Sequence, residues 1–240
     1  MLGRFLEFSV ETPDIGASLE FYAKLGFSQA DVGDAWHHPY AVVTDGRICI
    51  GLHQHSLGAP QLTFVKPDLL KHFDALERLG LEFEFRRLGN NVFNEVGWRD
   101  PSGHLIRLVE ARTFSPSKRP TTDHAACGYF LEIVLPSQNI EDSKSFWERL
   151  GFVGMDEPGT RLPHVCCTSD TINIGLYDPS ELPDAALLFD ADDIPGRVAR
   201  LAQLGVQAAR RPPASLQRGP AALFVAPEGT PILMWSGGHG

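Results

Sequence analysis

The feature that most constrains this chain is that its two halves repeat each other at a spacing of 125 residues. Residues 5–27 align with residues 130–152, and nine of these 23 positions are identical. Sequences of ordinary composition give roughly one or two identities by chance over such a window. The register continues downstream with slips of one residue, which fall where loops are expected. The chain is therefore expected to contain two copies of one structural unit.

Each half divides again into two modules with the same order of predicted elements. In the first module, apolar runs predict a strand at 5–10, a helix at 15–25 that stops at Gly26, and strands at 27–32, 40–44 and 47–53. The second module repeats this order with a strand at 61–66, a helix at 68–79 and strands at 81–88, 92–98 and 104–109. The second half has the same pattern, with helices at 140–150 and 193–204. This pattern predicts an α+β fold of four βαβββ modules, in curled mixed sheets with helices on the convex side.

The module order also gives the domain boundaries. We expect an N-terminal domain over residues 1–111, with modules 1–55 and 60–111. The C-terminal domain is expected over residues 127–236, with modules 127–178 and 184–236. Residues 112–126 contain Pro, Ser, Thr and Lys, which is typical of an exposed linker.

The charge balance indicates which kinds of partner the protein binds, and the cysteines indicate its cellular compartment. The chain has 21 Lys and Arg against 30 Asp and Glu, a net charge of −9, so we expect no nucleic-acid partner. Its longest apolar stretches are strand-sized and its start lacks a secretory pattern, so no membrane association is expected. Four cysteines without CxxC spacing are typical of reduced thiols and predict a cytoplasmic protein. The expected partner is a small molecule, and the expected state is a monomer or a homodimer.

Three motifs resemble the vicinal oxygen chelate superfamily, which includes glyoxalase I, the extradiol dioxygenases, and fosfomycin- and bleomycin-resistance proteins. The first motif is the first strand followed by Asp14 and a helix that contains Phe21-Tyr22 and ends at Leu25-Gly26-Phe27. The second is the start of the second module, with Phe64, Asp68 and Leu79-Gly80. The third is the segment Asp100-Pro101-Ser102-Gly103-His104-Leu105. The resemblance spans nearly the whole chain, in the tandem two-domain form. It implies that paired modules form two cup-shaped sheets. It also implies that a cup commonly holds a divalent metal on His, Glu or Gln side chains from the first and fourth strands.

The ligand positions implied by this resemblance carry a poor donor set in this chain. They are Glu7, Gly51, Gln61 and Arg107 in the first half, and Glu132, Gly175, Ala186 and Leu233 in the second. Such metals need three or four convergent donors, and a guanidinium group repels a dication. Pairing the modules within each half, or exchanging them between halves, gives no set of three good ligands. We therefore predict a degenerate metal site that holds no metal, and we expect no cofactor.

Arginine at a ligand position suggests a different use for the cup. A buried arginine needs an acidic partner or an anionic ligand. We expect Arg107 to hold the anionic group of a small ligand, helped by Glu7 if each half closes on itself, or by Glu132 if modules are exchanged. The remaining expected ligand-binding residues are His53, Gln61 and Trp98. The predicted function is a metal-free protein, similar to glyoxalase and bleomycin-resistance proteins, that binds a small anionic or aromatic molecule; whether it is an enzyme stays open.

Two other interpretations remain at this point. Glu7 with His53 or His55 has the ligand types of a two-histidine, one-carboxylate site, which would make the protein a divalent-metal-dependent lyase or dioxygenase. In the other interpretation the protein is structural or regulatory, its cups are filled by side chains, and Arg107 forms a structural ion pair.

Overall fold

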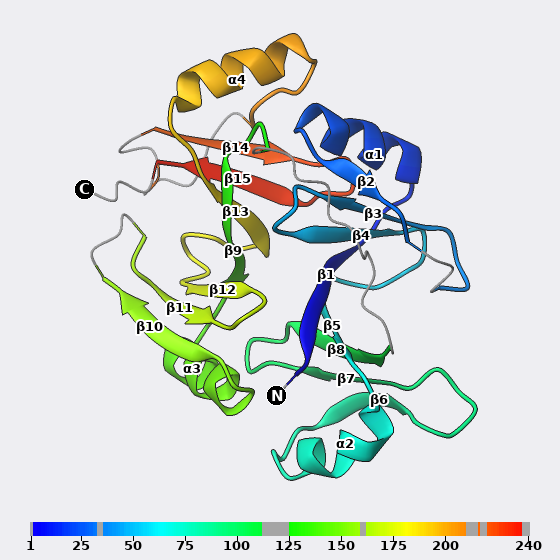
Figure 1. Ribbon diagram of the computed structural model, residues 1–240. Coiled ribbons are helices and arrows are strands. Elements are labelled where there is room, and N and C mark those ends of the chain that lie inside the picture. The colour runs from blue at the N-terminus through cyan, green and yellow to red at the C-terminus, as the bar shows by residue number, and fades with distance from the viewer. Residues whose placement is uncertain are drawn as a thin grey trace.

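The computed structural model describes residues 2–32, 36–111, 125–158, 162–209, 216 and 220–236. Within these ranges the chain forms two mixed sheets, one in each half, with four helices around them (Figure 1). The predicted linker at 112–126 lies mostly outside the described residues. None of the helices in these ranges is long and apolar enough to cross a membrane.

The first half folds into an eight-stranded sheet with strand order β2-β3-β4-β1-β5-β8-β7-β6. Its elements are β1 (Arg4–Glu11), α1 (Ile15–Lys24), β2 (Ser28–Ala30), β3 (Tyr40–Thr44), β4 (Cys49–His53), β5 (Gln61–Lys66), α2 (Leu69–Glu77), β6 (Phe83–Arg87), β7 (Glu95–Arg99) and β8 (Leu105–Glu110). β1 runs parallel to β4 and antiparallel to β5, and β5 runs parallel to β8. Both modules of this half therefore pair within one sheet, which decides between the two pairings that the sequence leaves open.

The second half forms an equivalent sheet with strand order β10-β11-β12-β9-β13-β15-β14. Its elements are β9 (Tyr129–Pro136), α3 (Ile140–Arg149), β10 (Val153–Glu157), β11 (His164–Thr168), β12 (Asn173–Tyr177), β13 (Ala186–Asp190), α4 (Ile194–Gln203), β14 (Ala221–Val225) and β15 (Pro231–Trp235). The counterpart of β6 would fall near residue 210, where the described residues are interrupted. The predicted α+β class is confirmed.

The helices begin and end at the residues that the sequence marks. Asp14 accepts a hydrogen bond from the Ala17 N–H at 3.0 Å, at the start of α1. In the second half, the equivalent position before α3 has an asparagine cap. Gly26, just after α1, has φ +86°, a left-handed backbone conformation that glycine adopts at little cost.

Strand alternation gives each sheet two different faces. The face covered by helices is apolar, and those faces of both sheets join in one continuous core. Ring contacts cross between the halves, with centroid distances of 6.3 Å from Phe27 to Phe189 and 6.5 Å from Phe64 to Phe152. The functional groups of interest lie on the opposite face of each sheet, which we call the cup face.

A reciprocal contact between turns and helices also joins the two halves. In the turn before β15, Glu228 accepts hydrogen bonds from the Ser18 hydroxyl at 2.8 Å and the Tyr22 hydroxyl at 2.6 Å, both on α1. The equivalent turn of the first half places Ser102 against α3, where its hydroxyl lies 3.2 Å from that of Ser143. Each half therefore contacts the first helix of the other half through the equivalent turn. The turn residue is Glu228, with a carboxylate, in the second half and Ser102, with a hydroxyl group, in the first.

Candidate functional site

Glu7 lies at the centre of the N-terminal cup, which is the cup face of β1, β3, β4, β5, β7 and β8. Its side chain is 1% exposed. Glu7 Oε1 accepts hydrogen bonds from Ser9 Oγ and His53 Nε2, each at 2.8 Å, and Oε2 accepts one from Tyr40 Oη. These donors compensate the buried carboxylate. Gly51 on the neighbouring strand makes room for it, because a methyl group there would overlap the Glu7 carboxyl group.

The hydrogen bonds continue from Glu7 through His53 to a second histidine. His53 Nδ1 lies 2.8 Å from His38 Nε2, so both ring nitrogens of His53 have partners. Because the Glu7 oxygen accepts, we assign the proton to His53 Nε2, and Nδ1 then accepts from His38. The His38 ring stacks on His55 with centroids 4.7 Å apart. Burial lowers the pKa of His38, and the neighbouring His53 and His55 lower it further.

Arg107 on β8 pairs with Glu95 on β7 rather than with Glu7. Arg107 Nη2 contacts Glu95 Oε2, and the arginine side chain is 17% exposed. The two residues share the cup face because Arg107 lies opposite Gly97, two residues beyond Glu95 on β7. The guanidinium carbon lies 4.4 Å from the centre of the Trp36 ring and 5.7 Å from that of Phe85. Aromatic rings thus lie over the guanidinium group, and Nη2 is paired with Glu95.

Two buried polar atoms beside this ion pair have no hydrogen-bond partner within the described part of the chain. They are Arg107 Nε and Gln61 Oε1. Both residues line an open cavity of about 350 Å³, whose other lining residues are Phe85, Arg86, Arg87 and Glu95. Arg86 pairs with Glu77 and lies over the Phe73 ring on the helix side. Arg87 and Arg107 against Glu95 leave the cavity with one excess positive charge in an acidic chain, which attracts small anions. A ligand with hydrogen-bonding groups would satisfy the two buried atoms.

The second cup keeps the same buried cluster with two members exchanged. Tyr177 Oη donates to Glu132 Oε1 at 2.5 Å, and the His164 ring stacks on Tyr177 with centroids 4.4 Å apart. In the repeat, Glu132 matches Glu7, whereas His164 on β11 and Tyr177 on β12 match Tyr40 and His53. Each cup therefore contains a glutamate, a histidine and a tyrosine. The tyrosine is on β3 and the histidine on β4 in the first cup, whereas the histidine is on β11 and the tyrosine on β12 in the second.

Around this cluster the second cup is apolar. The counterparts of Ser9, Gln61, Thr63 and Arg107 are Val134, Ala186, Leu188 and Leu233. These four residues belong to one buried hydrophobic cluster, into which Leu162 and Leu216 also pack. A cavity of about 400 Å³ remains at its edge, and Leu182, Leu223 and Leu233 contribute to its lining. The second cup therefore has no counterpart of the positive cavity among the described residues.

Glu132 gives the second cup a pH dependence. Burial raises the pKa of Glu132, and the negative charge of Glu157 adds to this effect. His164 and hydrogen bonds from Tyr177 and Cys166 act in the opposite direction. A carboxyl group whose pKa is higher in the folded chain favours folding below its ordinary pKa, and this contribution is lost as the pH rises through the folded value.

We expect Glu132→Gln to be more stable than the parent at pH 7, because the amide carries no charge in the buried site. The amide oxygen still accepts from Tyr177 and cannot ionise, so the decline in stability with rising pH should flatten. Urea unfolding between pH 4 and pH 8 measures this slope, with Glu148→Gln on the exposed face of α3 as the control. Identical slopes for the parent and Glu132→Gln would contradict the assignment.

The structure brings four of the six predicted ligand-binding residues into the N-terminal cup. They are Glu7, His53, Gln61 and Arg107. Trp98 does not line the cup: it is fully buried and packs against Phe83 in the core on the helix side, with ring centroids 5.9 Å apart. Its neighbour Gly97 takes the position opposite Arg107, so strand alternation turns Trp98 away. Glu132 lies in the second cup, because each half closes on its own sheet.

The sequence alone does not point to several residues of the cup. They are Ser9, Trp36, His38, Tyr40, Thr63, Phe85 and Glu95. For Tyr40 a signal exists, because at a spacing of 124 it meets His164 just as His53 meets Tyr177. Trp36 and His38 lie outside the strands, where no periodicity marks the direction of a side chain.

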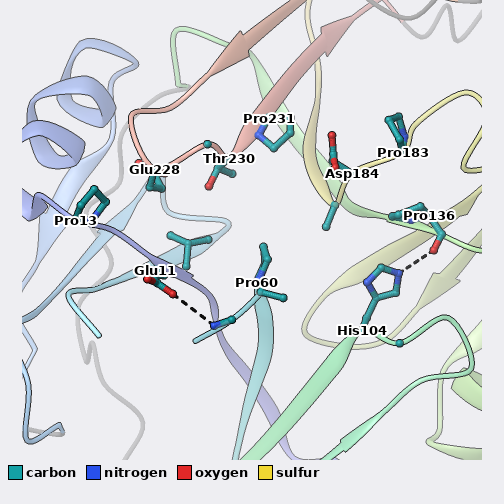
Figure 2. Close-up of a pocket in the computed structure, with 16 residues that line it drawn as sticks. Glu11, Pro13, Pro60, His104, Pro136, Pro183, Asp184, Glu228, Thr230 and Pro231 are labelled. Atoms are coloured by element: carbon teal, nitrogen blue, oxygen red, sulfur yellow. Dashed lines mark hydrogen bonds between the residues drawn. The ribbon is translucent and has the colours of Figure 1, made fainter. Parts of the chain in front are cut away.

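A larger cavity of about 610 Å³ lies between the two halves. Figure 2 shows Glu11, Pro60 and His104 from the first half around it, together with Pro136 and Pro231 from the second. Several of its polar groups are engaged within the protein: Glu11 accepts from the Gly58 N–H at 3.4 Å, and His104 Nε2 donates to the Pro136 carbonyl at 2.8 Å. None of its lining residues has a buried side-chain atom without a hydrogen-bond partner among the described residues. We therefore place the candidate site in the N-terminal cup.

The fold agrees with solved structures, whereas no protein-family model and no curated protein matches the chain. A catechol 2,3-dioxygenase superposes with a TM-score of 0.59 and 14% identity, covering 97% of this chain and 88% of that one. The 2,3-dioxygenase LapB from Pseudomonas sp. KL28 gives 0.60 and 17%, covering 96% and 91%. An extradiol ring-cleaving dioxygenase from B. fuscum gives 0.63 and 15%, covering 97% and 71%.

At this level of identity the likeness shows the fold. The chain shares the α+β fold of these dioxygenases over nearly its whole length, with the modules of each half paired in one sheet. The fold that the resemblance of the sequence motifs implies is thus confirmed over nearly the whole chain.

Proposed function

We propose that this protein binds a small anionic, aromatic molecule in the N-terminal cup, on Arg107 and without a metal ion. The observation that carries the proposal is the pair of unpartnered buried atoms, Arg107 Nε and Gln61 Oε1, lining one positive cavity. Trp36 and Phe85 add aromatic surface beside the guanidinium group. Anion recognition by an arginine next to aromatic rings is a common way to hold an aromatic carboxylate.

The donor set does not fit a divalent metal. At the family's ligand positions, the carboxyl group of Glu7 occupies the space in front of Gly51, and Arg107 is a permanent cation. His53 cannot converge with its neighbours on an ion, since its two nitrogens face Glu7 and His38 from opposite edges of the ring. No cluster of three His, Cys, Asp or Glu side chains suited to a metal occurs among the described residues.

The second candidate is a metal-dependent dioxygenase or lyase that uses Glu7 with His53 or His55. Its support is the fold, which is shared with proteins described as extradiol dioxygenases. The third, a structural or regulatory protein with filled cups, suits the apolar second cup better than the positive first one. A small-molecule partner, the lack of nucleic-acid or membrane partners, the cytoplasmic location and a monomeric or dimeric state stay predictions.

Calorimetry with benzoate, the simplest aromatic anion, tests the proposal. We expect binding by the parent and a loss of at least about 30-fold in affinity for Arg107→Ala, the range for truncating a buried charged contact. Arg99→Ala removes an exposed Arg–Glu pair from β7 and should bind like the parent. The double variant Arg107→Met with Glu95→Gln leaves no unpaired carboxylate, so its loss of binding cannot be attributed to misfolding.

Metal analysis of protein purified without chelators separates the first two candidates. The proposal expects no stoichiometric iron, manganese, zinc or nickel, and no oxygen consumption with catechol. A fully occupied metal that is lost in Glu7→Gln, together with oxygen uptake, would establish the metalloenzyme instead. Equal benzoate affinity in the parent and Arg107→Ala would exclude the anion site.

A further inference from the structure

The two unpartnered atoms of the N-terminal cup differ in hydrogen-bond character. Arg107 Nε–H is a donor that lacks an acceptor, whereas Gln61 Oε1 is an acceptor that lacks a donor. A simple carboxylate offers acceptors alone, so it satisfies the arginine and leaves the glutamine oxygen unpaired. A ligand that satisfies both atoms must therefore have a hydrogen-bond donor as well as an anionic acceptor.

The orientation of the Gln61 amide follows from its second hydrogen bond. Gln61 Nε2 donates to the Leu57 carbonyl oxygen at 3.4 Å, and a carbonyl cannot donate in return. This contact turns Oε1 away from Leu57. Gln61 is 5% exposed and lines the same cavity as Arg107, so Oε1 is a buried, unpartnered acceptor in the wall of this cavity.

Strand pairing places the two side chains within reach of one small molecule. Thr63 lies directly opposite Arg107 across the β5–β8 ladder, and Gln61 precedes Thr63 by two residues on the same face. With about 4.8 Å between strands and about 3.3 Å per residue along a strand, such diagonal neighbours are about 8 Å apart, which long side chains span. Thr63 itself is engaged with Ser9 at 2.7 Å between the two hydroxyl oxygens, so Gln61 is the polar group that faces the ligand.

The surroundings of Arg107 fix the direction from which a ligand meets it. Nη2 is engaged by Glu95, and the rings of Trp36 and Phe85 lie over the guanidinium group. An anion therefore meets Arg107 in the guanidinium plane, where the buried Nε–H still lacks an acceptor. The Trp36 ring also packs edge to face on the Tyr40 ring, with centroids 6.3 Å apart, so Tyr40 supports the aromatic surface beside Arg107.

We propose that the ligand is an aromatic hydroxy acid, whose carboxylate binds Arg107 Nε while its hydroxyl group donates to Gln61 Oε1. Gln61 is then the residue that determines specificity, because it distinguishes a hydroxy acid from the same acid without a hydrogen-bond donor. A site built around a buried acceptor discriminates strongly against analogues that leave the acceptor unpaired. This inference rests on the proposed function, since it requires the anion to bind at Arg107.

The test measures the affinities of 2-, 3- and 4-hydroxybenzoate, the three matching methoxybenzoates, and benzoate. We expect at least one hydroxybenzoate isomer to bind about tenfold or more tightly than benzoate and than its methoxy counterpart. In Gln61→Met the amide is replaced by a side chain of similar length without a strong acceptor, and this preference should fall to about twofold or less while benzoate affinity stays near that of the parent. Gln29→Met, on the exposed side of β2, is the matched control and should keep the preference.

The outcomes separate this inference from the proposed function on which it rests. If benzoate and all hydroxybenzoates bind with equal affinity, and Arg107→Ala abolishes binding of all of them, the anion site stands and the role of Gln61 is refuted. That role is refuted as well if the preference persists unchanged in Gln61→Met. If none of the seven acids binds to the parent, the proposed function itself fails and the inference falls with it.

Discussion

Replacing Glu7 with alanine is expected to lower the free energy of unfolding by about 3–5 kcal/mol, the range for removing one partner from a buried, hydrogen-bonded charge network. The Glu7 side chain accepts hydrogen bonds from Ser9, Tyr40 and His53, all within the N-terminal cup. Alanine leaves these three donors without their acceptor and opens a cavity in front of Gly51. Urea unfolding monitored by circular dichroism measures the loss.

The conservative variant Glu7→Gln separates hydrogen bonding from simple volume. Its amide has the same shape but one acceptor oxygen, so it should retain part of the network and lose less stability than alanine. A loss below about 1 kcal/mol for Glu7→Ala would mean that the cluster contributes little to folding. In that case the cup residues would have to be explained by ligand binding alone.

The second large effect is expected at the contact between the halves. Glu228→Ala should destabilise the protein by about 2–4 kcal/mol, because Tyr22 and Ser18 lose a charged acceptor. The Tyr22 side chain is fully buried, so its hydroxyl group cannot turn to water instead. Differential scanning calorimetry of the parent and the variant measures the change in Tm.

The internal repeat supplies the control for this experiment. Ser102→Ala removes the equivalent turn side chain, whose partners on the other half are hydroxyl groups that also contact each other, as in the 2.8 Å bond from Ser137 to Ser143. We expect a loss of about 1 kcal/mol or less. Equal effects at the two positions would show that the Glu228 carboxylate adds nothing beyond packing.

The fold was predictable because the residues that mark the ends of its helices and strands lie close together in the sequence and recur in each module. Asp14 before the first helix and Gly26 after it mark the ends of that helix in the sequence, and the structure confirms both. The choice between pairing modules within a half and exchanging them was not predictable. Both arrangements use the same strands with the same faces, and they differ only in which strand edges meet.

The site was predictable only where a strand's register could be transferred from the family pattern. This transfer placed Glu7, Gln61 and Arg107 on one face, as the structure has them. The expectation for Trp98 rested on its place beside the Asp100 turn, and it was wrong because strand alternation turns this side chain into the core on the helix side. Trp36 comes from a non-strand segment, and its position over Arg107 depends on tertiary packing alone.

The shared apolar core has a consequence for the second half of the molecule. Its own cup is closed by leucines, yet its aromatic side chains complete the hydrophobic layer behind the first sheet. The sheet that carries the proposed site therefore packs against a half whose own cup has no arginine at the matching position. By the proposal above, the first domain binds the ligand, and the second contributes part of the core behind it.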